Sequence, residues 1–121
     1  MAFINNWEAG GVYKVFSGDV TGSEVLDSAV EVEEDQRFDQ VRYVINDFLA
    51  VDGVDANERD IALVAAIDRA ASKTNPDIRI AVVATQQKII ELAQHYSRLI
   101  EDCPFQAQLF ASVEDARNWL A

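Results

Sequence analysis

The alternation of extended and helical patterns is the feature that most restricts how this chain can fold. Two runs rich in β-branched residues, at 41–49 and 78–84, are each followed by a segment whose apolar residues repeat every three or four positions. A shorter extended run at 105–110 precedes a last helical pattern. Strands that are separated by a helix long enough for a crossover lie parallel, with right-handed connections. The alternation therefore predicts an α/β domain with a mainly parallel sheet.

The first 34 residues predict an antiparallel hairpin and a helix. Residues 3–16 contain two extended segments around Glu8-Ala-Gly-Gly, where glycine can supply the positive φ of a tight reversal. Thr21 stands three residues before Glu24, which is the spacing of a capping box. The first helix is therefore expected to begin near Thr21 and to run to about Glu34.

Polar caps mark where the three later helices are expected to begin. Asp55, with an acidic residue three positions later, predicts the start of the second helix after a loop at 50–54. Thr85 is expected to cap the third helix, and Ser112 the fourth. The predicted order is β-β-α-β-α-β-α-β-α, a mixed sheet with an N-terminal antiparallel hairpin.

Composition supports one domain over residues 1–121 and restricts its partners. Half of the 121 residues are apolar, so the chain can bury a full core without disulfides or metal. The formal charge of −11 repels phosphate backbones and anionic lipids, which argues against nucleic acid and membrane surfaces as partners. Cys103 is the single cysteine, and the N-terminal residues lack the basic and apolar blocks of a signal peptide. A cytoplasmic location without membrane insertion is expected.

Several segments carry a resemblance to a known family. They are Tyr43-Val-Ile-Asn-Asp-Phe, Asp68-Arg-Ala-Ala with Asn75-Pro, Ile78-Arg-Ile-Ala-Val-Val-Ala, and Phe110-Ala-Ser-Val-Glu-Asp-Ala-Arg-Asn-Trp-Leu. Over roughly residues 10–121 the chain resembles the SpoIIAA-like group of small bacterial STAS-type domains. The resemblance implies a mixed sheet packed on helices, as in anti-sigma-factor antagonists and CRAL-TRIO lipid-binding proteins. Each motif is a core pattern with caps, so the resemblance concerns architecture.

One departure from the family pattern bears on function. Antagonists of this family carry a phosphorylatable serine in a turn that follows the strand equivalent to residues 41–48. Here no serine or threonine lies between Asp47 and Asp60. A phosphate at a helix N-terminus is favoured by free N–H groups and the helix dipole, but it needs a hydroxyl to carry it. We therefore expect no phosphoserine switch at this position.

The candidate ligand-binding residues are Asn46, Asp47, Thr85 and Gln86. They lie at the ends of the two predicted inner strands, where open α/β sheets place ligands. Structural roles compete with this interpretation. Asp47 can accept backbone N–H groups of the following loop, and Thr85 can serve as a helix N-cap.

Motifs for catalysis, metals and cofactors are absent from the sequence. The acidic segment 52–60 does not have the spacing of an EF-hand, because glycine follows the first aspartate directly. His95 is the only histidine, and its spacing builds neither a zinc site nor a triad. Acidic neighbours disfavour the thiolate of Cys103. No catalytic residue, metal or cofactor is therefore expected.

Three functional hypotheses remain. The first is a non-enzymatic binding or regulatory module that acts on a protein partner or holds a small apolar ligand between helices and sheet. The second is a small carboxylate-dependent hydrolase or isomerase, with Asp47 as base and Asp52 or Asp55 nearby. The third is a structural or assembly protein, to which the acidity of the chain points.

The aromatic residues near the two ends raise one further alternative. Trp7 and Trp119 are expected to anchor the packing. If the leading hairpin lies at a sheet edge, Phe3, Ile4 and Trp7 can instead form a self-complementary patch for a homodimer.

Overall fold

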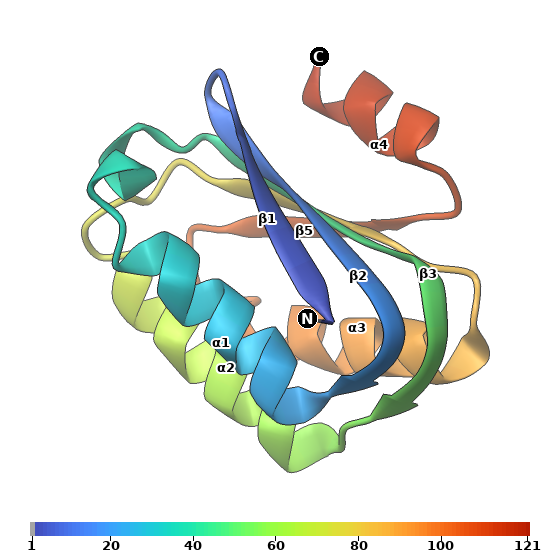
Figure 1. The fold of residues 1–121 in the computed structure, drawn as a ribbon. Helices are drawn as coiled ribbons and strands as arrows, with labels where there is room; N and C mark the ends of the chain where they lie inside the picture. The colour runs from blue at the N-terminus through green and yellow to red at the C-terminus, as the bar shows by residue number, and fades with distance from the viewer. Residues whose placement is uncertain (1) are drawn as a thin grey trace.

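Five strands form one sheet in which the spatial order equals the chain order, β1-β2-β3-β4-β5 (Figure 1). The computed structural model describes residues 2–121. The strands are β1 (Phe3–Glu8), β2 (Gly11–Thr21), β3 (Tyr43–Asp55), β4 (Arg79–Val83) and β5 (Gln106–Phe110). The helices are α1 (Gly22–Glu33), α2 (Glu58–Ala71), α3 (Gln87–Leu99) and α4 (Val113–Leu120), with a 3-10 helix, η1 (Gln36–Gln40), after α1.

The pairing of the strands confirms the predicted mixed sheet. β1 and β2 are antiparallel, and every other neighbouring pair is parallel. The hairpin turns at Gly10, whose φ of +81° lies in the left-handed region that glycine adopts without steric cost. Each parallel pair is joined through a helix, as the crossover rule requires.

Two of the four predicted helix starts are confirmed and two are wrong. Thr21 forms the capping box of α1, and the Ser112 side chain accepts the N–H of the third residue of α4. The cap of α2 is Asn57 rather than Asp55, because β3 stays paired with β2 as far as Asp55. The cap position of α3 is Gln86 rather than Thr85, and it makes no side-chain capping bond.

The largest error in the sequence prediction concerns the loop expected at 50–54. β3 continues through this segment to Asp55, because β2 extends to Thr21 and supplies the partner backbone. Two register shifts, after Val15 and after Gly18, interrupt the ladder between the two strands. Such irregularities increase the local bend and twist of a strand. Figure 1 shows the resulting curvature of β2 and β3 around the helices.

The two faces of the sheet are covered unequally. Helices α1, α2 and α3 pack on one face, where Val12, Val44 and Ile80 meet residues of all three helices in the largest apolar cluster. Only α4 packs on the opposite face, where Ala116 contacts the cluster of Ile45, Ala81 and Val83. Within residues 2–121 no helix has both the length and the apolar character needed to cross a bilayer.

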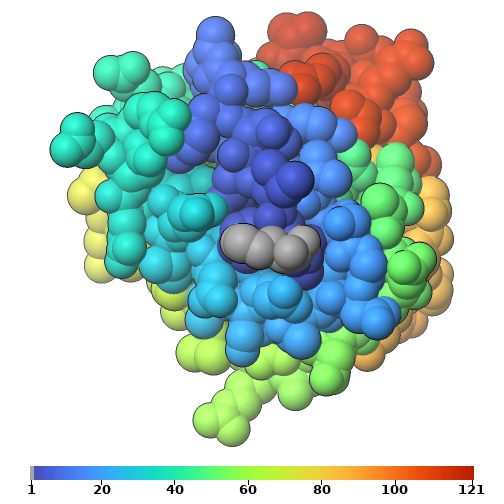
Figure 2. Space-filling view, viewed as in Figure 1, coloured from blue at the N-terminus to red at the C-terminus, as the bar shows by residue number. Residues whose placement is uncertain are grey.

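Helix α1 is attached to the edge strand β1. The Ser28 hydroxyl donates to the Asn5 side-chain oxygen at 2.9 Å, and the Asn5 amide donates to the Ser28 carbonyl oxygen at 3.4 Å. Figure 2 shows β1 and α1 side by side on the same surface of the molecule. The helix that covers one side of the interior is therefore anchored to the sheet through its outermost strand.

Candidate functional site

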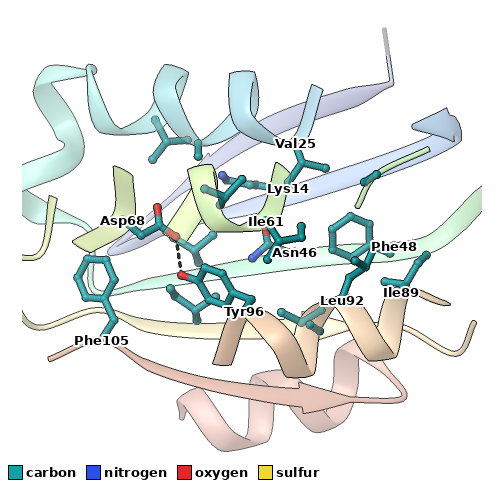
Figure 3. Close-up of a pocket in the computed structure, with 18 of the residues that line it drawn as sticks. Lys14, Val25, Asn46, Phe48, Ile61, Asp68, Ile89, Leu92, Tyr96 and Phe105 are labelled. Atoms are coloured by element: carbon teal, nitrogen blue, oxygen red, sulfur yellow. Dashed lines mark hydrogen bonds between the residues drawn. The ribbon is translucent and has the colours of Figure 1, made fainter. Parts of the chain in front are cut away.

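A cavity of about 110 Å³ lies between the sheet and helices α1, α2 and α3 (Figure 3). Most of its wall is apolar: Val44, Ile80 and Val82 come from the sheet, and Ile61 and Leu92 from the helices. Phe48 lies toward the end opposite Asp68 (Figure 3). Concave sites with apolar walls and a few polar groups are typical of small-molecule binding.

Five polar side chains from five different elements also line the cavity. They are Lys14 of β2, Glu33 of α1, Asn46 of β3, Asp68 of α2 and Tyr96 of α3. Polar residues are uncommon at such buried positions unless they are paired. Their convergence on one space makes the cavity the candidate functional site.

Lys14 reaches the cavity because of the alternation along β2. Val12, Lys14 and Phe16 are all buried and share one face of the strand, since successive strand residues point to opposite faces. The backbone of Lys14 is paired with that of Asn46 on β3, and Asn46 is paired with Val82 on β4. The three residues therefore form a row across the floor of the cavity.

The ammonium group of Lys14 has no partner among residues 2–121: its side chain makes neither a hydrogen bond nor an ion pair within 4.0 Å to them. The residue as a whole is only 6% exposed. No buried side-chain nitrogen or oxygen of the described residues lacks a partner, so the ammonium group itself borders accessible space. Burial lowers the pKa of Lys14 to about 8, although the charges of Asp68, Glu33 and Glu31 act in the opposite direction. An amine that lines a cavity in this way can contact a molecule that enters it.

The carboxyl groups of Asp68 and Glu33 form the acidic part of the cavity. The Tyr96 hydroxyl donates to the Asp68 carboxylate at 2.5 Å (Figure 3). Burial, followed by hydrogen bonding to Asp68, raises the pKa of Glu33 well above its usual range. Glu33 therefore favours its neutral form more than an ordinary glutamate does. Helices α1 and α2 thus each present a carboxyl group to the cavity that Lys14 lines.

The structure brings only Asn46 of the four predicted ligand-binding residues into this cavity. Asp47 is buried on the opposite face of β3, where it accepts the Tyr13 hydroxyl at 2.5 Å and the backbone N–H of Leu49 at 2.9 Å. Thr85 is exposed. Gln86 donates its side-chain amide to the Val51 carbonyl at 2.5 Å and thereby ties the start of α3 to β3.

The acids of the enzymatic hypothesis do not meet at one point. Asp47 and Asp52 lie five residues apart in the same strand, which corresponds to roughly 16 Å at about 3.3 Å per residue. Asp55 is further along, and both Asp52 and Asp55 are exposed. Across the part of the chain that the structure describes, no three metal-ligating side chains cluster. The geometry thus gives this carboxylate set no common substrate position.

Sequence reasoning missed Lys14, Glu33, Asp68 and Tyr96. The signals were present in two of these cases. Lys14 occupies an inward position of an alternating strand, and Asp68 follows Ile61, Val64 and Ala65 at the next position of the inward stripe of α2. A charged residue in a periodic apolar position is the pattern that marks such a site.

The arrangement of the elements has close counterparts among solved structures. The unphosphorylated form of the anti-sigma factor antagonist SpoIIAA aligns with a TM-score of 0.65 and 13% identity, covering 98% of this chain and 97% of that one. The phosphorylated form of the Bacillus cell fate determinant SpoIIAA gives 0.65 and 14%, covering 99% of this chain and 100% of that one. The fold is SpoIIAA-like.

A third structure extends the comparison to an uncharacterised protein. This member of the DUF3478 family from Shewanella loihica PV-4, described as having a SpoIIAA-like fold, aligns with a TM-score of 0.60 and 13% identity over 99% of this chain and 93% of that one. The sequence matches no protein-family model and no curated protein. The structural likeness confirms the predicted SpoIIAA-like architecture.

Proposed function

We propose that the protein is a non-enzymatic regulatory module that binds a small, mainly apolar ligand in the cavity beneath α1, α2 and α3. The observation that carries this proposal is the cavity itself, which combines about 110 Å³ of space with apolar walls and five polar side chains. For scale, an engineered protein cavity of about 150 Å³ binds benzene. The ligand is therefore of benzene size or smaller, and it carries one polar group.

The polar side chains of the cavity would give the ligand a fixed orientation. An apolar body would lie along Val44, Ile80 and Leu92, and its polar group would lie near Asn46 and Lys14. Polar groups that remain unpaired in a buried site favour ligands that satisfy them. The polar side chains therefore provide specificity, and the apolar walls provide most of the affinity.

The regulatory part of the proposal rests on the fold and on a missing hydroxyl. SpoIIAA, to which the chain is similar in fold, is an anti-sigma factor antagonist with an unphosphorylated and a phosphorylated form. Here the segment from Asp47 to Asp60 has no serine or threonine that could carry a phosphate. Occupancy of the cavity would replace phosphorylation as the signal that alters binding to a protein partner.

A cytoplasmic location and a homodimer are further parts of the proposal. The single cysteine, Cys103, fits a reducing compartment. Of the three residues expected to form a patch on the hairpin, Phe3 is buried and Trp7 is covered by the Arg37 guanidinium at 4.0 Å. Ile4 alone is clearly exposed, at 62%. A monomeric mass at micromolar concentration would contradict a dimer through Ile4.

The binding proposal is tested with 1-butanol and benzene as probes. In a titration followed by amide chemical shifts, we expect saturable changes in α1, α2, α3 and the strand residues below them, and none in α4. Ala93 lines the cavity, so the variant Ala93→Leu should fill it and abolish these changes. The matched control is Ala111→Leu, because Ala111 is exposed and does not line the cavity.

The outcome that contradicts the proposal is equally specific. Shifts that do not saturate, or that persist unchanged in Ala93→Leu, would place the probes outside the cavity. Circular dichroism of both variants checks that they remain folded.

A further inference from the structure

We propose that Lys14 is a reactive amine that captures a small aldehyde or ketone in the cavity as an imine. This inference rests on the proposed function, because the carbonyl compound is the ligand that the cavity takes up. It adds a chemical class and a covalent step to that function.

The first argument is the position of Lys14 among the polar groups of the cavity. Asp68 accepts the Tyr96 hydroxyl, and hydrogen bonding to Asp68 contributes to the raised pKa of Glu33. Lys14 lines the cavity with no hydrogen bond or ion pair to residues 2–121. A lysine side chain carries three hydrogen-bond donors, and here they can engage a ligand in the cavity.

The second argument concerns the charge of that ligand. Asp68 lines the same cavity as Lys14 and its charge acts on the amine, so an anionic head group would meet a carboxylate as well as the ammonium. A neutral carbonyl oxygen avoids this repulsion and can accept a hydrogen bond from Lys14. The cavity volume of about 110 Å³ also suits a compact carbonyl compound.

The third argument is the reactivity of the amine. A free amine, rather than an ammonium ion, attacks a carbonyl carbon, and desolvation in an apolar pocket activates lysine in this way. Burial lowers the pKa of Lys14 to about 8. Lys73 and Lys88, the only other lysines, are exposed, and Lys88 donates to the Val54 carbonyl oxygen at 2.9 Å.

The cavity contains the groups that the reaction needs. The ammonium of Lys14 first loses a proton to a carboxylate of the cavity. The amine nitrogen then forms a bond to the carbonyl carbon as the C–O π bond breaks, and the oxygen takes up a proton from Glu33 to give a carbinolamine. The nitrogen then loses its two remaining protons. One of them returns to Glu33, and the other joins the hydroxyl group, which leaves as water while the C=N bond forms. The products are one imine and one water molecule, and no oxidant or reductant is consumed.

The test is reductive trapping with butanal and sodium cyanoborohydride at pH 7. Hydride from cyanoborohydride reduces the imine to a stable secondary amine, which peptide mass spectrometry assigns to a particular lysine. We expect Lys14 to be modified about tenfold faster than Lys73, because the larger fraction of free amine outweighs the lower nucleophilicity of a less basic nitrogen. Excess 1-butanol should slow modification of Lys14 and leave Lys73 unaffected.

Two variants separate the cavity effect from general reactivity. Ala93→Leu should protect Lys14 and leave modification of Lys73 and Lys88 unchanged. Lys14→Met should remove the fast phase, whereas the control Lys73→Met should keep it. Amide spectra of each variant report whether the fold is retained.

The possible results distinguish this inference from the function on which it rests. If 1-butanol binds in the cavity but Lys14 reacts no faster than Lys73, the imine is wrong and the binding module stands. If neither probe binds and Lys14 is not favoured, both proposals fail. Fast modification of Lys14 that Ala93→Leu leaves unchanged would also overturn the inference, because the aldehyde would then reach the amine by another route.

Discussion

Polar side chains on the two faces of the sheet differ in their hydrogen bonding. On the α4 face, the Tyr43 hydroxyl and the Arg117 guanidinium both donate to Glu8, at 2.6 Å and 2.8–2.9 Å. The Arg79 guanidinium donates to the carbonyl oxygens of Trp119 and Leu120, both at 2.8 Å. On the other face, Lys14 has no partner among the described residues. These polar groups on the first face are bound by the protein, whereas Lys14 on the second face is not.

This difference between the two faces indicates which of them contributes more to stability. The bonds to Glu8 and from Arg79 fasten a short helix to the sheet. The three-helix face instead contains a cavity, which costs packing energy. This is the face on which we place the proposed ligand site.

The largest effect that tests this comparison comes from two matched truncations. Ile45→Ala on the α4 face removes a side chain with 0% exposure from close packing, and it should lower the free energy of unfolding by about 4 kcal/mol. Ile80→Ala truncates a residue that already borders the cavity and has fewer contacts to lose, so about 2 kcal/mol is expected. Urea unfolding measures both. Equal losses would mean that the two faces are equally well packed.

Asp47→Ala should produce the next largest effect. The variant leaves the Tyr13 hydroxyl and the Leu49 N–H without their acceptor, which should lower the free energy of unfolding by about 2 kcal/mol. Binding of 1-butanol should be unchanged, because Asp47 does not line the cavity. A weakened affinity would restore Asp47 as a ligand-binding residue. Burial and the hydrogen bond to Asp47 also raise the pKa of Tyr13 to about 12. Because the two side chains are hydrogen-bonded, Tyr13→Phe is the second variant of a double-mutant cycle with Asp47→Ala.

The smallest effect is a difference in pH dependence between Glu33→Gln and the parent protein. The pKa of Glu33 is raised above 4.5, so its stabilising contribution is fully present below pH 4.5 and declines as the pH rises. For a fully buried group, the free energy of unfolding would fall by about 1.4 kcal/mol per pH unit. Because Glu33 is partly exposed, we expect the free energy of unfolding to fall by about 1 kcal/mol in total between pH 5 and 7. Unfolding of Glu33→Gln should lack this decline.

A matched variant controls for the glutamate-to-glutamine substitution in that experiment. Glu34→Gln makes the same chemical change at the next residue, which is exposed and does not line the cavity. Its pH profile should follow that of the parent protein. A common profile for all three proteins would show that Glu33 titrates normally.

Much of the fold was predictable because it depends on local patterns. Thr21 with Glu24, and Ser112 before the last helix, satisfy backbone N–H groups within one turn, and such contacts are encoded over four residues. The run at 78–84 contains the strand that the structure places in the sheet as β4. The crossover rule then gives the parallel direction of strands that are neighbours in the sheet.

The remaining features depend on residues that are distant in the sequence. The segment 50–54 is a strand because β2 lies beside it, and neither segment alone reveals that pairing. The role of Asp68 likewise depends on Tyr96, 28 residues away. Lys14 was overlooked because a single lysine between apolar residues is also compatible with an exposed edge strand.

Lys14 faces the interior of the molecule because of the register between β2 and β3. Lys14 lies opposite Asn46, and Tyr13 lies opposite Ile45 on the other side of the sheet. Sliding β2 by one position would exchange these roles, so that a phenol entered the interior and the lysine faced α4. The one-residue register between β2 and β3 therefore decides which side chain faces the cavity.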